Sequence, residues 1–229
     1  MPDAAMLSEM EAGEGVGGVL DYLEAELGSP SFIEKLDEEP GAYDAIEDYL
    51  IDNKGAASTA DEKRATILYA DLNLKTTGGE ELINNSVSAL IGGDFGTTNW
   101  SNTADIKSFL LGFLPKVMPS GVNSQSEFND MIQGFVAASA AYDNFGNSSL
   151  TDIPDEINMG DVAQKAIVSY VIAEVLAETD YTSADLYDLS QGIDPGDPTI
   201  TGTVEDPFKA GNPVDNILTA AGIDVSNFQ

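Results

Sequence analysis

Carboxylates dominate the side chains of this sequence that could do chemistry. The chain of 229 residues carries 40 Asp and Glu against nine Lys and Arg, and it contains neither His nor Cys. Without these two residue types, the sequence lacks the commonest general base, the thiolate nucleophile and the usual ligands of zinc. The chemistry that remains is that of oxygen ligands and of paired carboxylates.

Four carboxylates form the best candidate for a metal site. They lie in the proline- and glycine-containing segment Gln191–Pro213 and are Asp194, Asp197, Glu205 and Asp206. Oxygen ligands on a rigid loop can hold calcium. The alternative, which we favour, is a solvated loop that wraps the outside of a helical bundle. Calcium is therefore the one cofactor that the sequence leaves open, and no other is expected.

The sequence shows no motif that is typical of an enzyme. A Ser or Thr nucleophile needs an activating base, and no His is present to supply one. The patterns Ser-x-x-Lys, Gly-x-Ser-x-Gly and the phosphate-binding loop are missing from the sequence. Two carboxylates can hydrolyse a glycoside, but among forty acids some pair always falls at a suitable distance. We therefore expect a protein without catalytic residues.

The net charge of −31 limits the partners of this protein. A compact chain of this mass exposes about 10,000 Å², which gives one net negative charge per roughly 300 Å². Most carboxylates must lie in water, since there are too few cations to pair with them. Such a surface repels nucleic acid and anionic membranes, and it attracts basic proteins and cations. No nucleic-acid partner is expected.

Three explanations of this acidity stay open. Adaptation to high salt has no clear support, because eight of the nine basic residues are Lys and only Arg64 is Arg. Mimicry of DNA requires a stripe of carboxylates, since duplex DNA carries one charge per about 1.7 Å of its axis. Here the acids are scattered from Asp3 to Asp224 without a continuous block. The third explanation, an acidic extracytoplasmic protein kept in solution by its charge, is the one we favour.

The location expected from this argument is periplasmic or extracellular, and a cytoplasmic one stays open. The first residues lack the basic-then-apolar pattern of a signal peptide, so an export signal would have to have been removed. The longest strongly apolar stretch, Phe109–Pro119, is too short to span a bilayer and contains Lys116. No transmembrane segment is therefore expected.

The elements that position these side chains are predicted to be helices. Apolar residues recur at helical spacing, for example at Val16, Leu20, Leu23 and Leu27. Capping residues precede several of these segments: Thr59, Asn102, Ser124, Thr182 and Asn212. Only Pro198–Val204 resembles a strand, and it could equally be an extended loop. The sequence predicts a single all-α domain, residues 1–229, with eight or nine helices.

A repeated motif indicates how the helices are organised. The sequence DNKGAAS at Asp52–Ser58 returns as DNFGNSS at Asp143–Ser149. Each copy precedes a matching pattern, which ends at Tyr69 in the first copy and at Tyr170 in the second. Asn and Gly accept the left-handed conformation that ends a helix, so each motif is interpreted as a helix end that leads into a buried central helix.

This repeat predicts two related helical-hairpin halves, at about residues 41–91 and 125–190. Residues 191–229 are expected to form an extended loop and a short C-terminal helix. Tyr69 and Tyr170 are expected to face the core, as is Trp100. Few positions agree between the two copies, so a chance similarity stays open.

The function expected from the sequence is that of a binding or scaffold protein. A groove lined by aliphatic and aromatic side chains and flanked by carboxylates should interrupt the acidic surface. Such a groove suits a neutral or cationic ligand or a basic protein segment. Two alternatives stay open: a DNA-mimicking inhibitor that sequesters basic proteins, and a calcium-binding surface protein.

Overall fold

The computed structural model describes residues 1–91 and 98–224, so the last five residues of the expected C-terminal segment lie outside the described residues. Over these two ranges the chain forms ten α-helices and no strand. The helices are α1 (Ala4–Leu27), α2 (Pro30–Glu38), α3 (Pro40–Lys54), α4 (Ala60–Thr76), α5 (Gly79–Ile91), α6 (Thr103–Val117), α7 (Gln125–Gly146), α8 (Met159–Glu178), α9 (Ser183–Ser190) and α10 (Pro213–Ala220).

The all-α prediction is confirmed. The described residues form ten helices, whereas eight or nine were expected. The first helix also extends beyond the periodic stretch that begins at Val16. It starts at Ala4, where the carboxylate of Asp3 accepts the N–H of Met6 at 2.8 Å, and it is kinked at Gly15, whose φ is 75°. Leu7, which is 1% exposed, places this additional part of the helix in the core.

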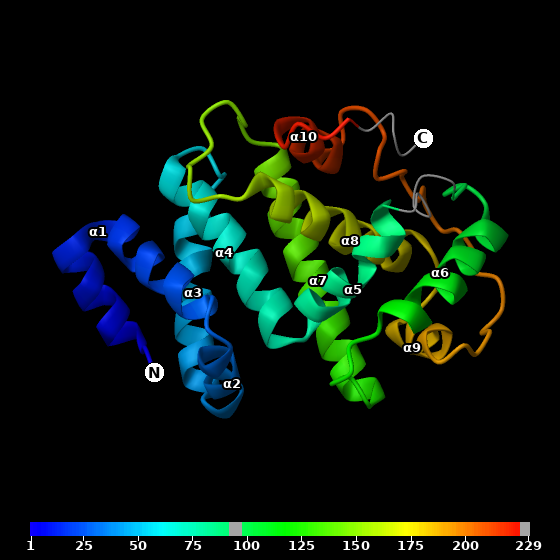
Figure 1. Cartoon of the computed structure of the whole chain (residues 1–229), viewed down its shortest axis with the longest axis horizontal. Helices are drawn as coiled ribbons and strands as arrows, with labels where there is room; N and C mark the ends of the chain where they lie inside the picture. Colours follow the sequence, from blue (N-terminus) through cyan, green and yellow to red (C-terminus); the bar gives the residue numbers. More distant parts are fainter. Residues whose placement is uncertain (92–97, 225–229) are drawn as a thin grey trace.

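Helix α4 separates two hydrophobic cores. The smaller core joins α1, α2 and α3 to one side of α4, through Ala65, Leu68 and Leu72. The larger core contains the other side of α4 together with side chains of α5 to α10. In Figure 1 the helices α1 to α3 accordingly lie at one end of an elongated molecule, and α6 and α9 lie at the other. The prediction that the helix containing Tyr69 is buried on several sides is confirmed.

Helices α7 and α8 form the centre of the larger core. Helix α7 packs against α4, α8 and α10. Helix α8 is buried along most of its length, including Lys165, which is 3% exposed, and Tyr170, which is 6% exposed. Trp100 is 4% exposed and meets Phe109 edge to face at 5.3 Å between ring centroids. The core positions expected for Tyr170 and Trp100 are confirmed, whereas Tyr69 is only partly buried.

The five capping residues identified in the sequence all begin helices. Thr59, Asn102, Ser124, Thr182 and Asn212 each accept a backbone N–H from the first turn that follows. Ser124 and Thr182 form reciprocal capping boxes with the acid three residues later. These contacts depend only on neighbours in the sequence, and this is why they could be predicted.

The two copies of the repeated motif end α3 and α7, but they do so in different ways. Gly55 has a positive φ of 44°, whereas Gly146 does not lie in that region. The prediction of a left-handed residue is therefore wrong for the second copy. A Cβ at Gly146 would lie 2.8 Å from the carbonyl carbon of Pro213, so this glycine allows α10 to approach closely.

The two copies of the motif also touch each other. The side-chain amide of Asn144 donates to the carbonyl of Gly55 at 3.2 Å. In both copies the motif joins two helices that pack together, α3 with α4 and α7 with α8. A common origin of the two hairpins stays a prediction.

Carboxylates fix the extended segment that precedes α10. The carboxylates of Asp180, Glu178 and Glu174 accept the backbone N–H groups of Thr199, Thr203 and Glu205 at 2.6, 2.7 and 3.2 Å. A single antiparallel bridge joins Thr179 and Ile200 where an edge strand or an extended loop was expected. The segment is thus an extended loop, bound to the C-terminal end of α8.

Candidate functional site

A cavity of about 230 Å³ lies where α1, α4 and α8 meet the loop that precedes α8. Its apolar surface comes from five side chains, which are Leu27, Ile67, Leu68, Ile157 and Val162. Its polar lining residues are Glu24, Arg64, Asp71, Lys75, Glu156, Asn158 and Asp161. The cavity thus combines an aliphatic surface with a carboxylate-rich rim.

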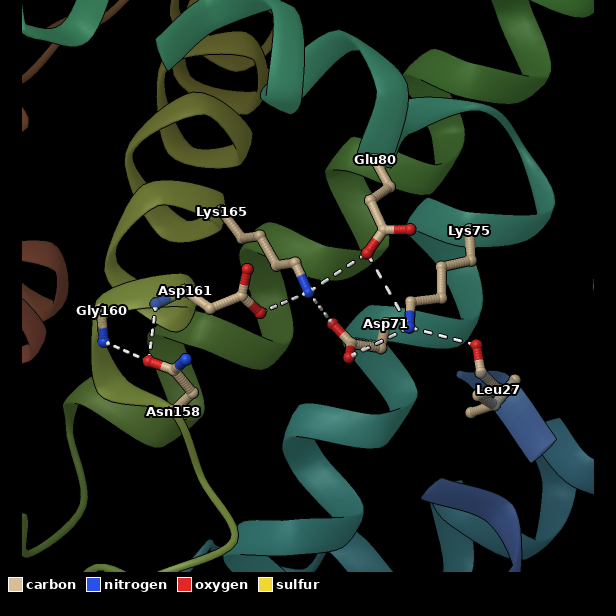
Figure 2. A network of polar contacts seen from close by, with 8 residues as sticks. All are labelled: Leu27, Asp71, Lys75, Glu80, Asn158, Gly160, Asp161 and Lys165. Atoms are coloured by element: carbon tan, nitrogen blue, oxygen red, sulfur yellow. Dashed lines mark hydrogen bonds and ion pairs between the residues drawn. The ribbon is translucent and has the colours of Figure 1, made fainter. Parts of the chain in front are cut away.

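Helical spacing places five of these residues on one wall. Arg64, Ile67, Leu68, Asp71 and Lys75 follow one another at intervals of no more than four residues, so they share one face of α4. On the opposite wall, Asn158 caps α8 by accepting the N–H groups of Gly160 and Asp161 at 3.1 and 3.3 Å (Figure 2). This cap fixes the backbone from which the carboxylate of Asp161 reaches the cavity.

One end of the cavity contains a network of charges centred on the buried Lys165 (Figure 2). Its side chain is 4% exposed, and its Nζ lies 2.8 Å from Oδ1 of Asp71 and 2.7 Å from Oδ2 of Asp161. Oε1 of Glu80, on α5, lies 3.6 Å from the same Nζ. Contacts with Lys165 therefore connect α8 to α4 and α5.

Lys75 extends the network to α1. Its Nζ donates to the carbonyl of Leu27 at 3.1 Å and lies 3.8 Å from Oε1 of Glu80. The two lysines thus share the carboxylate of Glu80, and Asp71 also lies between them. Because α1 belongs to the smaller core and α8 to the larger one, this network holds the two cores together.

The environment raises the pKa of Lys165 and of the nearby Tyr142, so both pKa values lie well above neutral pH. Burial by itself lowers the pKa of Lys165, but the charge of Asp71 and hydrogen bonds to Asp161 and Asp71 outweigh it and raise the pKa. Burial, and then the charges of Asp71, Asp161 and Glu80, raise the pKa of Tyr142 on α7 well above its ordinary value. Lys165 therefore stays charged and Tyr142 neutral, and neither suits general acid–base catalysis near pH 7.

Arg64 occupies the other end of the same wall. Its side chain is 9% exposed, and its Nη2 lies 2.5 Å from Oδ1 of Asp21 and 3.1 Å from Oε2 of Glu24. Burial by itself lowers the pKa of Arg64, but hydrogen bonds to the two carboxylates outweigh it and raise the pKa. The Nε–H of Arg64 is buried and has no hydrogen-bond acceptor in the described parts of the chain.

The site as a whole is negative. Among the described residues that line the cavity or pair with its charged side chains, six carboxylates surround three cations, which gives a net charge of −3. The six are Asp21, Glu24, Asp71, Glu80, Glu156 and Asp161. Glu156 is exposed and makes no described ion pair, and only one oxygen of Asp161 contacts Lys165. Carboxylate oxygens therefore remain available to a cation.

The four carboxylates proposed as calcium ligands contact different parts of the molecule. Asp194 and Asp197 both pair with Lys107 of α6, the former at 3.2 Å. Glu205 pairs with Lys209 at 2.6 Å, and Asp206 accepts the N–H of Phe208 at 2.8 Å. Within residues 1–91 and 98–224, no three Asp or Glu side chains are grouped so that they could hold a metal ion. Calcium binding stays a prediction, and the described residues offer no group of ligands for it.

The groove expected from the sequence matches this cavity in part. Aliphatic side chains and flanking carboxylates are present, but no aromatic residue lines it among the described residues. Sequence reasoning missed Asp71 as a network member and used Lys165 only to align the repeat. One signal was available: Lys165 is the only cation in the helix Met159–Glu178, whose residues are mostly apolar, and a buried charge needs a partner.

No helix in the described residues is both long enough and apolar enough to cross a membrane. Comparison of the chain with models of known protein families, with curated proteins and with solved structures finds no match.

Proposed function

We propose that this protein is a non-catalytic binding or scaffold protein whose cavity between α1, α4 and α8 takes a basic group from a ligand or a protein partner. The observation that carries the proposal is the excess of carboxylates around an aliphatic cavity. A cation with an apolar body gains from both features, because it meets negative charge and buries its hydrocarbon part.

The size of the cavity supports a small guest. Pockets for drug-sized ligands measure about 300–1,000 Å³, and this cavity of about 230 Å³ is smaller. A short aliphatic amine or one basic side chain is of a suitable size. The non-catalytic part of the proposal is supported by the buried cations, since Arg64 and Lys165 are each held by at least two carboxylates.

Calorimetric titration with butylamine tests this proposal, with butanol as the neutral compound of the same shape. We expect butylamine to bind and butanol not to bind. The variant Glu156→Gln should weaken butylamine binding, because it removes a lining carboxylate that holds no described ion pair. The neighbouring variant Asp155→Asn is the matched control, since Asp155 is exposed and does not line the cavity.

The two alternative functions are tested in parallel. If the chain bound a DNA-binding protein tightly and duplex DNA reversed this binding, DNA mimicry would be the better explanation. Stabilisation by millimolar calcium that EDTA reverses, without any binding of amines, would replace it with calcium binding. The extracytoplasmic location stays a prediction.

A further inference from the structure

The first part of α1 forms a separate arm. Gly15, with a φ of 75° and a ψ of 175°, divides the helix into residues 4–14 and residues 16–27, and Figure 1 shows the bend between them at the end of the molecule. Only glycine adopts this backbone conformation readily. A Cβ at Gly18 would lie 2.5 Å from Cβ of Glu14, so a second glycine allows the arm to fold back against the rest of α1.

Few apolar side chains hold this arm, residues 4–14, in place. Leu7 is the only buried side chain within that range, and Met10 is half-buried. The second part of α1 buries four, which are Val19, Leu20, Leu23 and Leu27. Hydrophobic stabilisation is roughly proportional to the apolar area that is buried, so the arm is bound less firmly than the rest of the helix.

Pockets lie on both sides of the arm. One pocket, of about 420 Å³, separates the arm from α3 and is lined by four residues of the arm and five of α3. Another, of about 240 Å³, lies between the arm and α2, where Met6 and Phe32 line it. Closely packed helices leave no such spaces between them, so the arm can move away from α3 at a small loss of contacts.

Like charges face each other across the pocket between the arm and α3. Glu11 lines it from the arm, Asp48 and Asp52 line it from α3, and its described lining includes no cation. The arm also carries Glu9 and Glu14 and no basic residue. Repulsion between these exposed carboxylates acts over about 30 Å at 0.01 M salt and over about 3 Å at 1 M. It therefore opposes the docking of the arm mainly at low ionic strength.

We propose that the arm is a hinged element controlled by ionic strength, which moves away from α3 about Gly15 at low salt and docks when salt screens the facing carboxylates. Opening exposes Leu7 and the side chains of Ala45 and Tyr49, which line the same pocket. An apolar surface surrounded by acids then becomes accessible. The second part of α1, which lines the cavity described above, stays in place, so this inference is independent of the proposed function.

Hydrogen–deuterium exchange of the unaltered chain tests the inference. The arm is eleven residues long, and a detached helix of this length is too short to stay formed in water, so opening allows its amides to exchange. The amides of residues 19–27 are the reference, because they report changes in the stability of the whole fold. Relative to this reference, the exchange of residues 7–14 should slow at least about tenfold between 0.01 and 1 M salt.

The variant Asp48→Asn assigns the effect to the facing carboxylates. It removes one negative charge opposite Glu11, so at 0.01 M salt the arm should exchange about two- to fivefold more slowly, and at 1 M it should change little. Asp44→Asn is the matched control, because Asp44 is an exposed acid of the same helix that does not line the pocket. Its effect on the exchange of the arm should be clearly smaller.

Several results would overturn the inference. Amides of the arm that exchange as slowly as the reference at 0.01 M salt would show that the arm stays docked, and a ratio that salt does not change would exclude control by charge. Exchange that slows steadily from Leu7 to a fully protected Glu14 would indicate fraying of the helix end instead of movement at Gly15. Equal effects of the two variants would show that the carboxylates of the pocket are not the cause.

Discussion

Nζ of Lys165, on α8, lies 2.8 Å from Oδ1 of Asp71, on α4, and this pair joins the two helices that follow the repeated motif. When the two copies of the repeat are aligned, Lys165 of the second copy occupies the position of Arg64 in the first. Both cations are more than nine-tenths buried, and both contact at least two carboxylates. The two copies thus place a buried cation at the same position, next to the same cavity.

Replacement of Lys165 by Met should strongly destabilise the protein. The change leaves Asp71, Asp161 and Glu80 close together without the cation that they share, and breaking a buried ion pair from one side costs about 3–5 kcal/mol. Urea unfolding at pH 7 measures the loss. The control is Lys209→Met, which removes an exposed pair with Glu205 and should change stability by about 1 kcal/mol or less. Similar losses in the two variants would contradict the role assigned to the network.

Added salt should raise the melting temperature. The net charge of −31 makes the folded chain repel itself, and raising the ionic strength from 0.01 to 1 M shortens the Debye length from about 30 to about 3 Å. Calorimetric melting over this range measures the effect. The increase should shrink as the pH falls towards about 4, the ordinary range in which Asp and Glu side chains lose their charge. A melting temperature that does not respond to salt at pH 7 would show that the charges are spaced too widely to matter.

Replacement of Asp143 by Asn should stabilise the protein at neutral pH. Burial raises the pKa of Asp143, so keeping its carboxylate charged in the folded state is unfavourable above that pKa. The advantage of the variant should therefore be largest at pH 7. It should decrease as the pH falls towards about 4, near the pKa of an unfolded Asp.

Urea unfolding from pH 7 to pH 4 measures this dependence on pH. The matched control is Asp52→Asn, at the same position in the first motif, because Asp52 is exposed. Its effect on stability should be small and should change little with pH. If the gain in stability from Asp143→Asn grew as the pH fell, this would contradict a raised pKa of Asp143.

Replacement of Gly146 by Ala should destabilise the protein by about 1–3 kcal/mol, because the new methyl group would press on the backbone of Pro213. The loss should appear in urea unfolding. Gly13→Ala is the control, since Gly13 is exposed in α1 and a Cβ added there would meet no described atom within 4 Å. It should be neutral or stabilising, by up to about 1 kcal/mol. If Gly146→Ala left the stability unchanged, α10 would be able to move away from the added methyl group.

The sequence by itself determined the parts of this structure that depend on near neighbours. The 3.6-residue period of apolar side chains gave the helical class, and the caps at Ser124 and Thr182 needed only residues up to three positions away. The acidic surface also followed from composition, since nine cations cannot pair with forty acids. These features do not depend on how the helices pack.

Only the tertiary structure decided the site. Lys165 and Asp71 are 94 residues apart, and the two copies of the motif meet through Asn144 and Gly55, which are 89 residues apart. Because the sequence has forty acids, it does not indicate which of them are the partners of Lys165. Nor does Gly146 in the repeated motif indicate that α10 packs against it. Packing selects such contacts because buried charge must find a partner and close-packed backbones leave no room for a Cβ, and both conditions arise only when distant helices meet.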